Sequence, residues 1–189
     1  MNDHLPQSLK GQLLVAMPGL GDPNFFQTVI FMSEHTDDGA VGIVLNRTHP
    51  VLKGEMLFRE LKINHTKEAG DIPIHVGGPV HLNEIYILHG APFGWESTLR
   101  VNRAVALSNS IDILKAIAMN KGPEDFVLAL GCAGWGPGQI EGELRQNVWL
   151  TMPGSERLLF KTPLNMRWEA AMKKMGIDPL LLSNEAGHA

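Results

Sequence analysis

The apolar run at residues 126–130 leads directly into a glycine-rich stretch at 131–138, and this junction constrains the fold more than any other part of the sequence. The apolar run is typical of a buried strand, and residues 139–146 have a helical pattern. Four glycines in the eight residues between them predict a loop, because glycine is used where φ is positive or where another group approaches closely. The candidate binding residues in this loop are Gly134, Trp135, Gly136, Gly138 and Gln139.

Two interpretations of this loop stay open. In the first, the amide groups at the start of the following helix bind an anion, assisted by the helix dipole. In the second, the loop is a tight corner between strand and helix, and Trp135 packs into the core. Familiar nucleotide-binding loops do not fit, because Pro137 and Gly138 stand where a Walker A loop needs Lys and Ser/Thr. A hydrolase elbow is also excluded, since this loop has no serine.

Length, charge and cysteine content limit which kinds of protein this chain can be. The 189 residues suit one domain over 1–189, in which we expect residues 1–10 to be loosely ordered. The net charge is −4 and the longest basic run is Lys173-Lys174, which argues against nucleic-acid binding through phosphates. The single cysteine, Cys132, indicates a reducing compartment. The apolar run at 13–17 is too short to cross a membrane, so we expect a cytoplasmic protein.

Local patterns predict strands and helices without regular alternation, which favours an α+β fold over a doubly wound parallel sheet. The sequence Asp37-Asp38-Gly39 predicts a hairpin turn, and Ser108 or Ser110 is the expected N-cap of a helix that ends near Met119. Residues 64–71 and 91–96 are expected to be loops. The expected strands are 13–17, 27–34, 40–46, 72–76, 84–89, 126–130, 148–150 and 157–160, and the expected helices are 55–61, 111–119, 139–146 and 165–175.

Several motifs, in this order along the chain, resemble the AlgH/YqgE family. They include Asp22-Pro23-x-Phe25, Gly42-x-Val44-Leu45-Asn46-Arg47, Gly77-Gly78-Pro79-Val80, the stretch 131–141 and Arg167-Trp168. One position departs, since Cys132 stands where many relatives have an aromatic residue. The resemblance implies a single α+β domain of coiled, bifurcated, mostly antiparallel β-sheets with peripheral helices. It also implies a role as a regulator of gene expression, without a recognised DNA-binding motif and without an established biochemical activity.

A second group of candidate binding residues lies outside the glycine-rich loop. Asn46 and Arg47 end a strand that has the composition of a buried one, and a guanidinium there could clamp a carboxylate or a phosphate. A structural ion pair between Arg47 and Glu34, across the predicted hairpin, is the alternative. The candidate pocket would bring Asn46 and Arg47 together with the glycine-rich loop and with the corner formed by Gly77, Gly78 and Pro79.

The sequence gives little support for a metal site or for a catalytic nucleophile. Cys132 follows an apolar strand and precedes a helix, where its thiol pKa could be lowered, but an inert buried cysteine is the alternative. His75 and His81 flank the Gly77-Gly78 corner and could meet in space. The eight histidines include no HExxH motif and the chain lacks the cysteines of a zinc site, so we expect neither metal nor cofactor.

Three functions follow from these residues. The first, which we favour, is a non-enzymatic regulatory module that binds a small anionic ligand or a protein partner. The second is a small enzyme acting on a phosphorylated or carboxylated metabolite, with Arg47 as anion anchor and Glu34, His35 or Cys132 as acid, base or nucleophile. The third is a transcriptional regulator that binds DNA directly, which the charge of the chain supports least.

Overall fold

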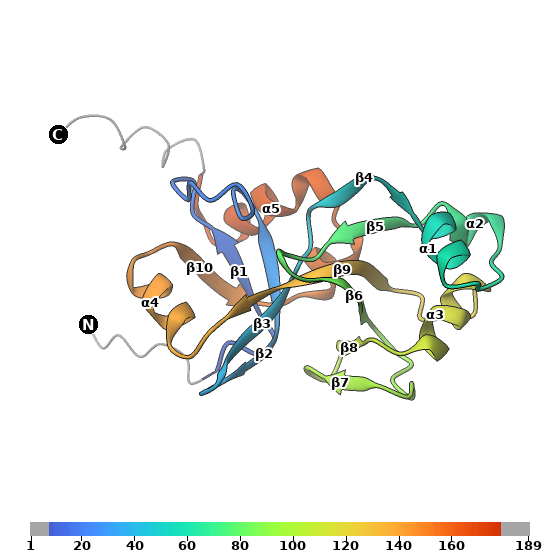
Figure 1. Ribbon diagram of the computed structural model, residues 1–189. Coiled ribbons are helices and arrows are strands. Elements are labelled where there is room, and N and C mark those ends of the chain that lie inside the picture. The colour runs from blue at the N-terminus through green and yellow to red at the C-terminus, as the bar shows by residue number, and fades with distance from the viewer. Residues whose placement is uncertain (1–7, 179–189) are drawn as a thin grey trace.

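Ten strands form one curled, branched sheet in the computed structural model, which describes residues 8–178 (Figure 1). The strand order along the main path is β10-β1-β2-β3-β9-β6-β8-β7, with antiparallel neighbours throughout. Off this path, β4 pairs with β5, and β5 runs parallel to β9. Short helices lie around the sheet. The expected α+β fold with a branched, mostly antiparallel sheet is therefore confirmed.

The strands of the sheet are β1 (Gln12–Ala16), β2 (Val29–Thr36), β3 (Gly39–Val44), β4 (Thr48–Lys53), β5 (Pro73–Val76), β6 (Val80–His89), β7 (Thr98–Arg100), β8 (Ala106–Ser108), β9 (Phe126–Trp135) and β10 (Trp149–Pro153). The α-helices are α1 (Gly54–Glu60), α2 (Lys67–Gly70), α3 (Ile111–Ala118), α4 (Gln139–Arg145) and α5 (Arg167–Lys174). In Figure 1, α1, α2 and α3 gather at one end of the sheet, and α4 lies at the other end beside β10. No helix between residues 8 and 178 is long and apolar enough to cross a membrane.

The sheet divides at β9. Over its first half, β9 pairs with β6 along one edge and with β5 along the other, where Val76 is the partner of Leu130. Its last residues pair with β3 instead, from Ala133 to Trp135. Strands β3 and β5 therefore leave the same edge of β9 in different directions. We call the place where they separate the fork.

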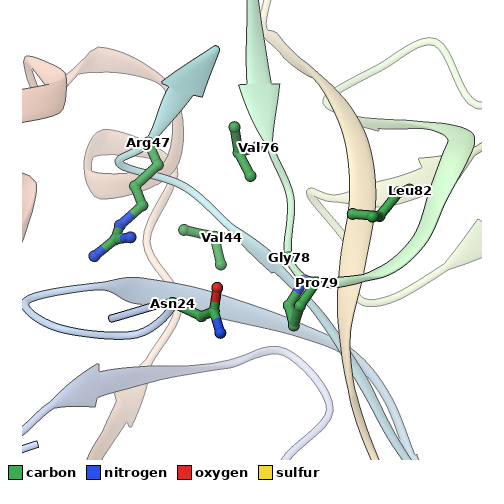
Figure 2. Close-up of a pocket in the computed structure, with 7 residues that line it drawn as sticks. All are labelled: Asn24, Val44, Arg47, Val76, Gly78, Pro79 and Leu82. Carbon is green, nitrogen blue, oxygen red and sulfur yellow. The ribbon is translucent and has the colours of Figure 1, made fainter. Parts of the chain in front are cut away.

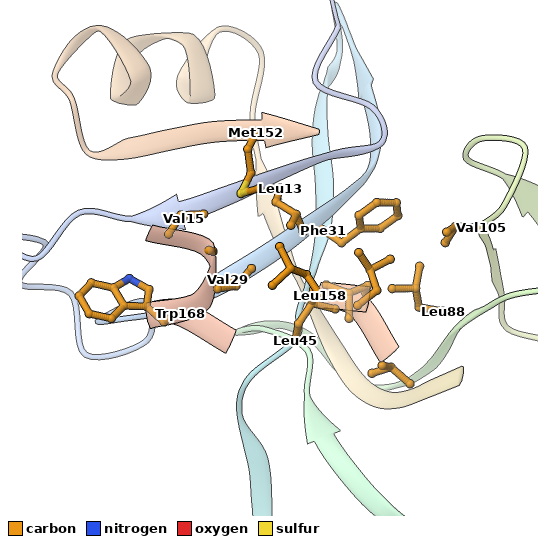
Figure 3. Close-up of a cluster of buried hydrophobic side chains, with 14 of the residues drawn as sticks. Leu13, Val15, Val29, Phe31, Leu45, Leu88, Val105, Met152, Leu158 and Trp168 are labelled. Atoms are coloured by element: carbon orange, nitrogen blue, oxygen red, sulfur yellow. The ribbon is translucent and has the colours of Figure 1, made fainter. Parts of the chain in front are cut away.

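The largest apolar cluster packs between the sheet and α5 (Figure 3). Leu13 and Phe31 from β1 and β2 are fully buried there, and Leu158 and Trp168 cover them from the C-terminal part of the chain. The Trp168 indole also donates a hydrogen bond of 2.8 Å to the carbonyl of Ala16. Since burying a large apolar side chain contributes about 1.5–3 kcal/mol, this cluster holds the curled sheet against α5.

Several local predictions are confirmed. The hairpin between β2 and β3 turns at Asp37 and Asp38, because Thr36 pairs with Gly39. Ser110 is the N-cap of α3, although its hydroxyl donates to Asp112 rather than capping a backbone amide. Helices α1, α4 and α5 lie where helical spacing placed them.

Other predictions are wrong. The strand at 126–130 continues through the glycines to Trp135, because β3 pairs with its second half. Residues 157–161 form a π-helical turn rather than a strand, since a short apolar run fits either structure. The loop expected at 64–71 contains α2, capped by the hydroxyl of Thr66. Strands β4, β7 and β8 were not expected at all.

The prediction for the N-terminus divides into two parts. Residues 8–10 are not loosely held, because Leu9 is buried and its amide donates a hydrogen bond of 3.0 Å to the His35 ring. Residues 1–7 lie outside the described part of the chain.

Candidate functional site

The fork is built by a close crossing of two backbones. A Cβ atom on Gly77 would lie 2.2 Å from the carbonyl oxygen of Gly131, and one on Gly78 would lie 2.2 Å from the carbonyl carbon of Cys132. Gly78 also has φ +150° and Gly131 has φ +72°, conformations that favour glycine. The β5–β6 corner therefore rests directly on β9. Gly77 and Gly78 of this corner, and Gly131 of the 131–138 stretch, permit this contact.

A pocket of about 220 Å³ opens at the fork (Figure 2). Its wall combines the end of β3, the β3–β4 connection and the β5–β6 corner. Arg47 and Asn24 lie on one side of it, and Pro79 and Leu82 lie on the other. The lining residues are Asn24, Val44, Arg47, Val76, Gly78, Pro79 and Leu82. We call this the fork pocket.

Arg47 carries the positive charge of the fork pocket. Its Nη1 donates a hydrogen bond of 2.7 Å to the carbonyl of Pro23, and its Nη2 donates one of 2.8 Å to the carbonyl of Phe26. The alternative ion pair with Glu34 does not form, and the guanidinium donates to two carbonyl groups instead. None of the residues that line the pocket is acidic. The guanidinium has five N–H groups, so donors remain for a further acceptor.

Asn46 lies beside Arg47 but has a structural role. Its Oδ1 accepts a hydrogen bond of 2.9 Å from the amide of Val29, and its Nδ2 donates one of 2.8 Å to the carbonyl of Gln27. Both polar ends of the side chain thus connect the end of β3 to the start of β2. Asn46 is not among the residues that line the fork pocket.

The residues expected in the glycine-rich loop form a separate network centred on Glu143. The Glu143 carboxylate accepts hydrogen bonds from the indoles of Trp135 at 3.0 Å and Trp149 at 2.7 Å, and from the Gln139 amide at 2.9 Å. Gln139 in turn accepts a bond of 3.1 Å from the amide of Gly136. This network of hydrogen bonds stabilises the turn that leads into α4. It lies apart from the fork pocket, whose lining includes none of these residues.

Gly134 and Gly138 have local roles in this region. Gly134 is an exposed β9 residue that pairs with Val41, and a Cβ on it would be 3.4 Å from the Val80 side chain. Gly138 is the N-cap of α4 with φ +70°. Of the ten candidate residues named from the sequence, the structure brings Arg47, Gly78 and Pro79 together in the pocket, with Gly77 directly behind them.

The candidate acid, base and nucleophile groups lie away from the fork pocket. Glu34 is exposed on β2, and Cys132 is 2% exposed. Burial raises the pKa of the Cys132 thiol, which is opposite to the change that a nucleophile needs. Because the His35 Nδ1 accepts the amide of Leu9, its Nε2 carries the proton and donates to Glu141 at 2.8 Å. Both ring nitrogens of His35 are therefore occupied.

The two histidines that flank the corner do not meet. His81 is exposed and lies 3.2 Å from the Glu84 carboxylate, whereas His75 is buried and its Nδ1 has no partner. Burial, together with the nearby charge of Arg167, lowers the pKa of His75 to about 4. Within residues 8–178, no group of three or more His, Cys, Asp or Glu side chains is placed to hold a metal ion.

Four residues of the fork pocket were not identified from the sequence: Asn24, Val44, Val76 and Leu82. Val44 and Val76 have the pattern of ordinary core residues, and in the structure Val44 is buried while Val76 is partly exposed at the fork. Asn24 lies in the turn cluster at 19–24, which gave no indication that it lines a pocket together with Arg47. Leu82 is 61% exposed, and no linear pattern distinguishes it from a surface leucine.

Comparison with known proteins agrees with this fold. A family model described as AlgH-like matches residues 13–180. The chain belongs to the AlgH-like family. Its relatives include a UPF0301 protein of Desulforapulum autotrophicum, 48% identical over 96% of both chains. Another, from Rhodospirillum rubrum, is 45% identical over 96% of this chain and 94% of its own.

Two solved structures have the AlgH-like fold. The solution structure of the AlgH protein from Pseudomonas aeruginosa has a TM-score of 0.79 and 39% identity, and the match covers all of both chains. The crystal structure of protein DIP2367 from Corynebacterium diphtheriae has a TM-score of 0.73 and 21% identity, over 97% of this chain and 95% of that one. The second likeness concerns the fold alone. The resemblance drawn from the motifs is thereby confirmed.

Proposed function

We propose that this AlgH-like protein is a non-enzymatic binding module that holds a small anion in the fork pocket. One observation carries the proposal: Arg47 lines a pocket without acidic residues, and within residues 8–178 its guanidinium bonds only to the carbonyls of Pro23 and Phe26. A cation without a carboxylate partner in a concave site favours an anionic ligand. The proposal also places the protein in the cytoplasm, a compartment that suits a chain whose single cysteine is Cys132.

The position of Arg47 supports binding rather than catalysis. Two hydrogen bonds fix the guanidinium against the 23–26 turn, so a ligand would meet a preorganised donor. No titratable side chain other than Arg47 lines the fork pocket. A general acid or base must come within about 3 Å of the proton that it transfers, and the pocket lining offers none.

The proposal is tested by calorimetric titration of acetate and inorganic phosphate into the wild-type protein, Arg47→Met and Arg103→Met. The methionine variant keeps the unbranched stem of Arg47 but removes its charge, while Arg103 is exposed on the β7–β8 connection and serves as the matched control. We expect weak saturable binding, with a dissociation constant on the order of millimolar, to the wild type and Arg103→Met and none to Arg47→Met.

Circular dichroism of Arg47→Met should retain the native spectrum, because water can replace the guanidinium at the exposed residues Pro23 and Phe26. Anion binding to folded Arg47→Met with wild-type affinity would overturn the proposal. Conversion of either anion into product would show that the protein is an enzyme.

A further inference from the structure

An apolar groove continues from the fork pocket into a second pocket of about 230 Å³. Val76 and Leu82 line both pockets, so the two adjoin one another. The second pocket is completed by His49, Leu52, His75 and Leu130. As in the fork pocket, none of its lining residues is acidic.

The floor of this groove crosses neighbouring strands on one face. Val76 of β5 pairs with Leu130 of β9, and paired residues present their side chains to the same face of a sheet. The carbonyl of Arg47 accepts a hydrogen bond of 3.0 Å from the amide of Val76, so the backbone of Arg47 lies beside one end of this floor. His75, which precedes Val76 on β5, also lines the second pocket, and the charge of Arg167 is close enough to act on its ring.

Leu82 forms the cover of the groove. Its Cδ2 would lie only 3.5 Å from a Cβ on Gly131, so the missing side chain at that position makes room for it. Leu82 nevertheless remains 61% exposed. An apolar ligand in the groove would remove part of this side chain from water, which stabilises the complex in proportion to the buried area.

We propose that the ligand is a carboxylate with an apolar tail. The carboxylate bonds to Arg47, and the tail lies on Val76 beneath Leu82 and extends toward Leu52 and Leu130. Each pocket alone is smaller than the roughly 300–1,000 Å³ of a typical ligand site, so one receives the charged head and the other the tail. This inference rests on the proposed function, since it assumes that Arg47 binds the anion.

The test is a calorimetric series of acetate, butanoate, hexanoate and octanoate, with hexanol as the uncharged comparison. Affinity should rise by about fourfold for each added CH₂ until the groove is filled, as expected for burial of a methylene group. Leu52→Ala, at a residue that lines only the second pocket, should weaken hexanoate binding severalfold and leave acetate binding unchanged. Leu99→Ala, at a leucine that is 36% exposed on β7, is the matched control and should change neither.

The outcomes separate the two proposals. Equal affinity for acetate and hexanoate, with no effect of Leu52→Ala, would overturn the apolar tail and leave the anion site intact. Hexanol binding as tightly as hexanoate would overturn the assignment of a carboxylate. If neither acetate nor hexanoate bound, the proposed function would fail, and the inference drawn from it would fail as well.

Discussion

The β5–β6 corner and β9 touch backbone to backbone, because a Cβ on Gly78 would lie 2.2 Å from the carbonyl carbon of Cys132. This contact brings Pro79 and Leu82 to the fork, opposite Arg47. The glycine motifs of the sequence thus create the pocket indirectly. They allow two chain segments to cross at a distance that no side chain would permit.

Gly78→Ala should therefore destabilise the protein strongly. The added methyl group meets backbone atoms that cannot move aside, and φ +150° is strained for alanine, so we expect a loss of on the order of 3 kcal/mol in the free energy of unfolding. Urea denaturation measures this change. Gly21→Ala is the matched control, because a Cβ there has no neighbour within 4 Å, and its effect should be within about 0.5 kcal/mol. Equal stability of the two variants would contradict the close crossing.

Removal of the Glu143 carboxylate should loosen the turn into α4. In Glu143→Ala the indole N–H groups of Trp135 and Trp149, both at least nine-tenths buried, lose their acceptor, and we expect a loss of about 2–4 kcal/mol in the free energy of unfolding. Glu143→Gln keeps one acceptor oxygen and should lose less. Glu60→Ala, at an exposed position of α1, controls for the loss of charge. Thermal unfolding followed by circular dichroism distinguishes these cases, and equal midpoints for Glu143→Ala and Glu60→Ala would refute the bracing role.

The buried ring of His75 should make stability depend on pH. Its pKa falls from 6.5 to about 4, first through burial and then through the charge of Arg167. The unfolded chain therefore binds a proton at a higher pH than the folded protein does. The stability that the neutral ring contributes is complete above pH 6.5 and decreases as the pH falls from 6.5 toward 4, by up to about 3 kcal/mol.

This dependence is measured by urea denaturation of the wild type and His75→Gln at several pH values in that window. The difference in free energy of unfolding between the two proteins should shrink as the pH falls, since only the wild type carries the titrating ring. A difference that stays constant with pH would show that His75 does not titrate in this way.

The parts of the fold that depend on residues close together along the chain were predictable from the sequence. Asp37 and Asp38 turn the chain locally, and the apolar spacing of α3 identifies its buried face. Strand β4 was not predictable, because it is an exposed strand that contains Pro50. The turn at 157–161 was misread because Leu158 and Leu159 fit a short buried strand equally well.

The candidate site was predictable only in part, for a physical reason. The glycines of the sequence indicated unusual backbone conformations at Gly77, Gly78 and the 131–138 stretch. They did not indicate that these segments cross or that a pocket forms beside the crossing. The contact between Arg47 and the 23–26 turn joins residues more than twenty positions apart, and no local pattern encodes it. The Trp135–Gln139 segment has the same glycine-rich character as the corner, yet Glu143 binds its polar groups.

The anion site is tested most directly by a titration of the ¹⁵N-labelled protein with acetate, followed by amide chemical shifts. We expect saturable shifts confined to the fork pocket, at the amides of Asn24, Arg47 and Gly78, and these shifts should disappear in Arg47→Met. Shifts centred on Gly138 and Gln139, or shifts that persist unchanged in Arg47→Met, would contradict the claim that the fork of the sheet is the anion site.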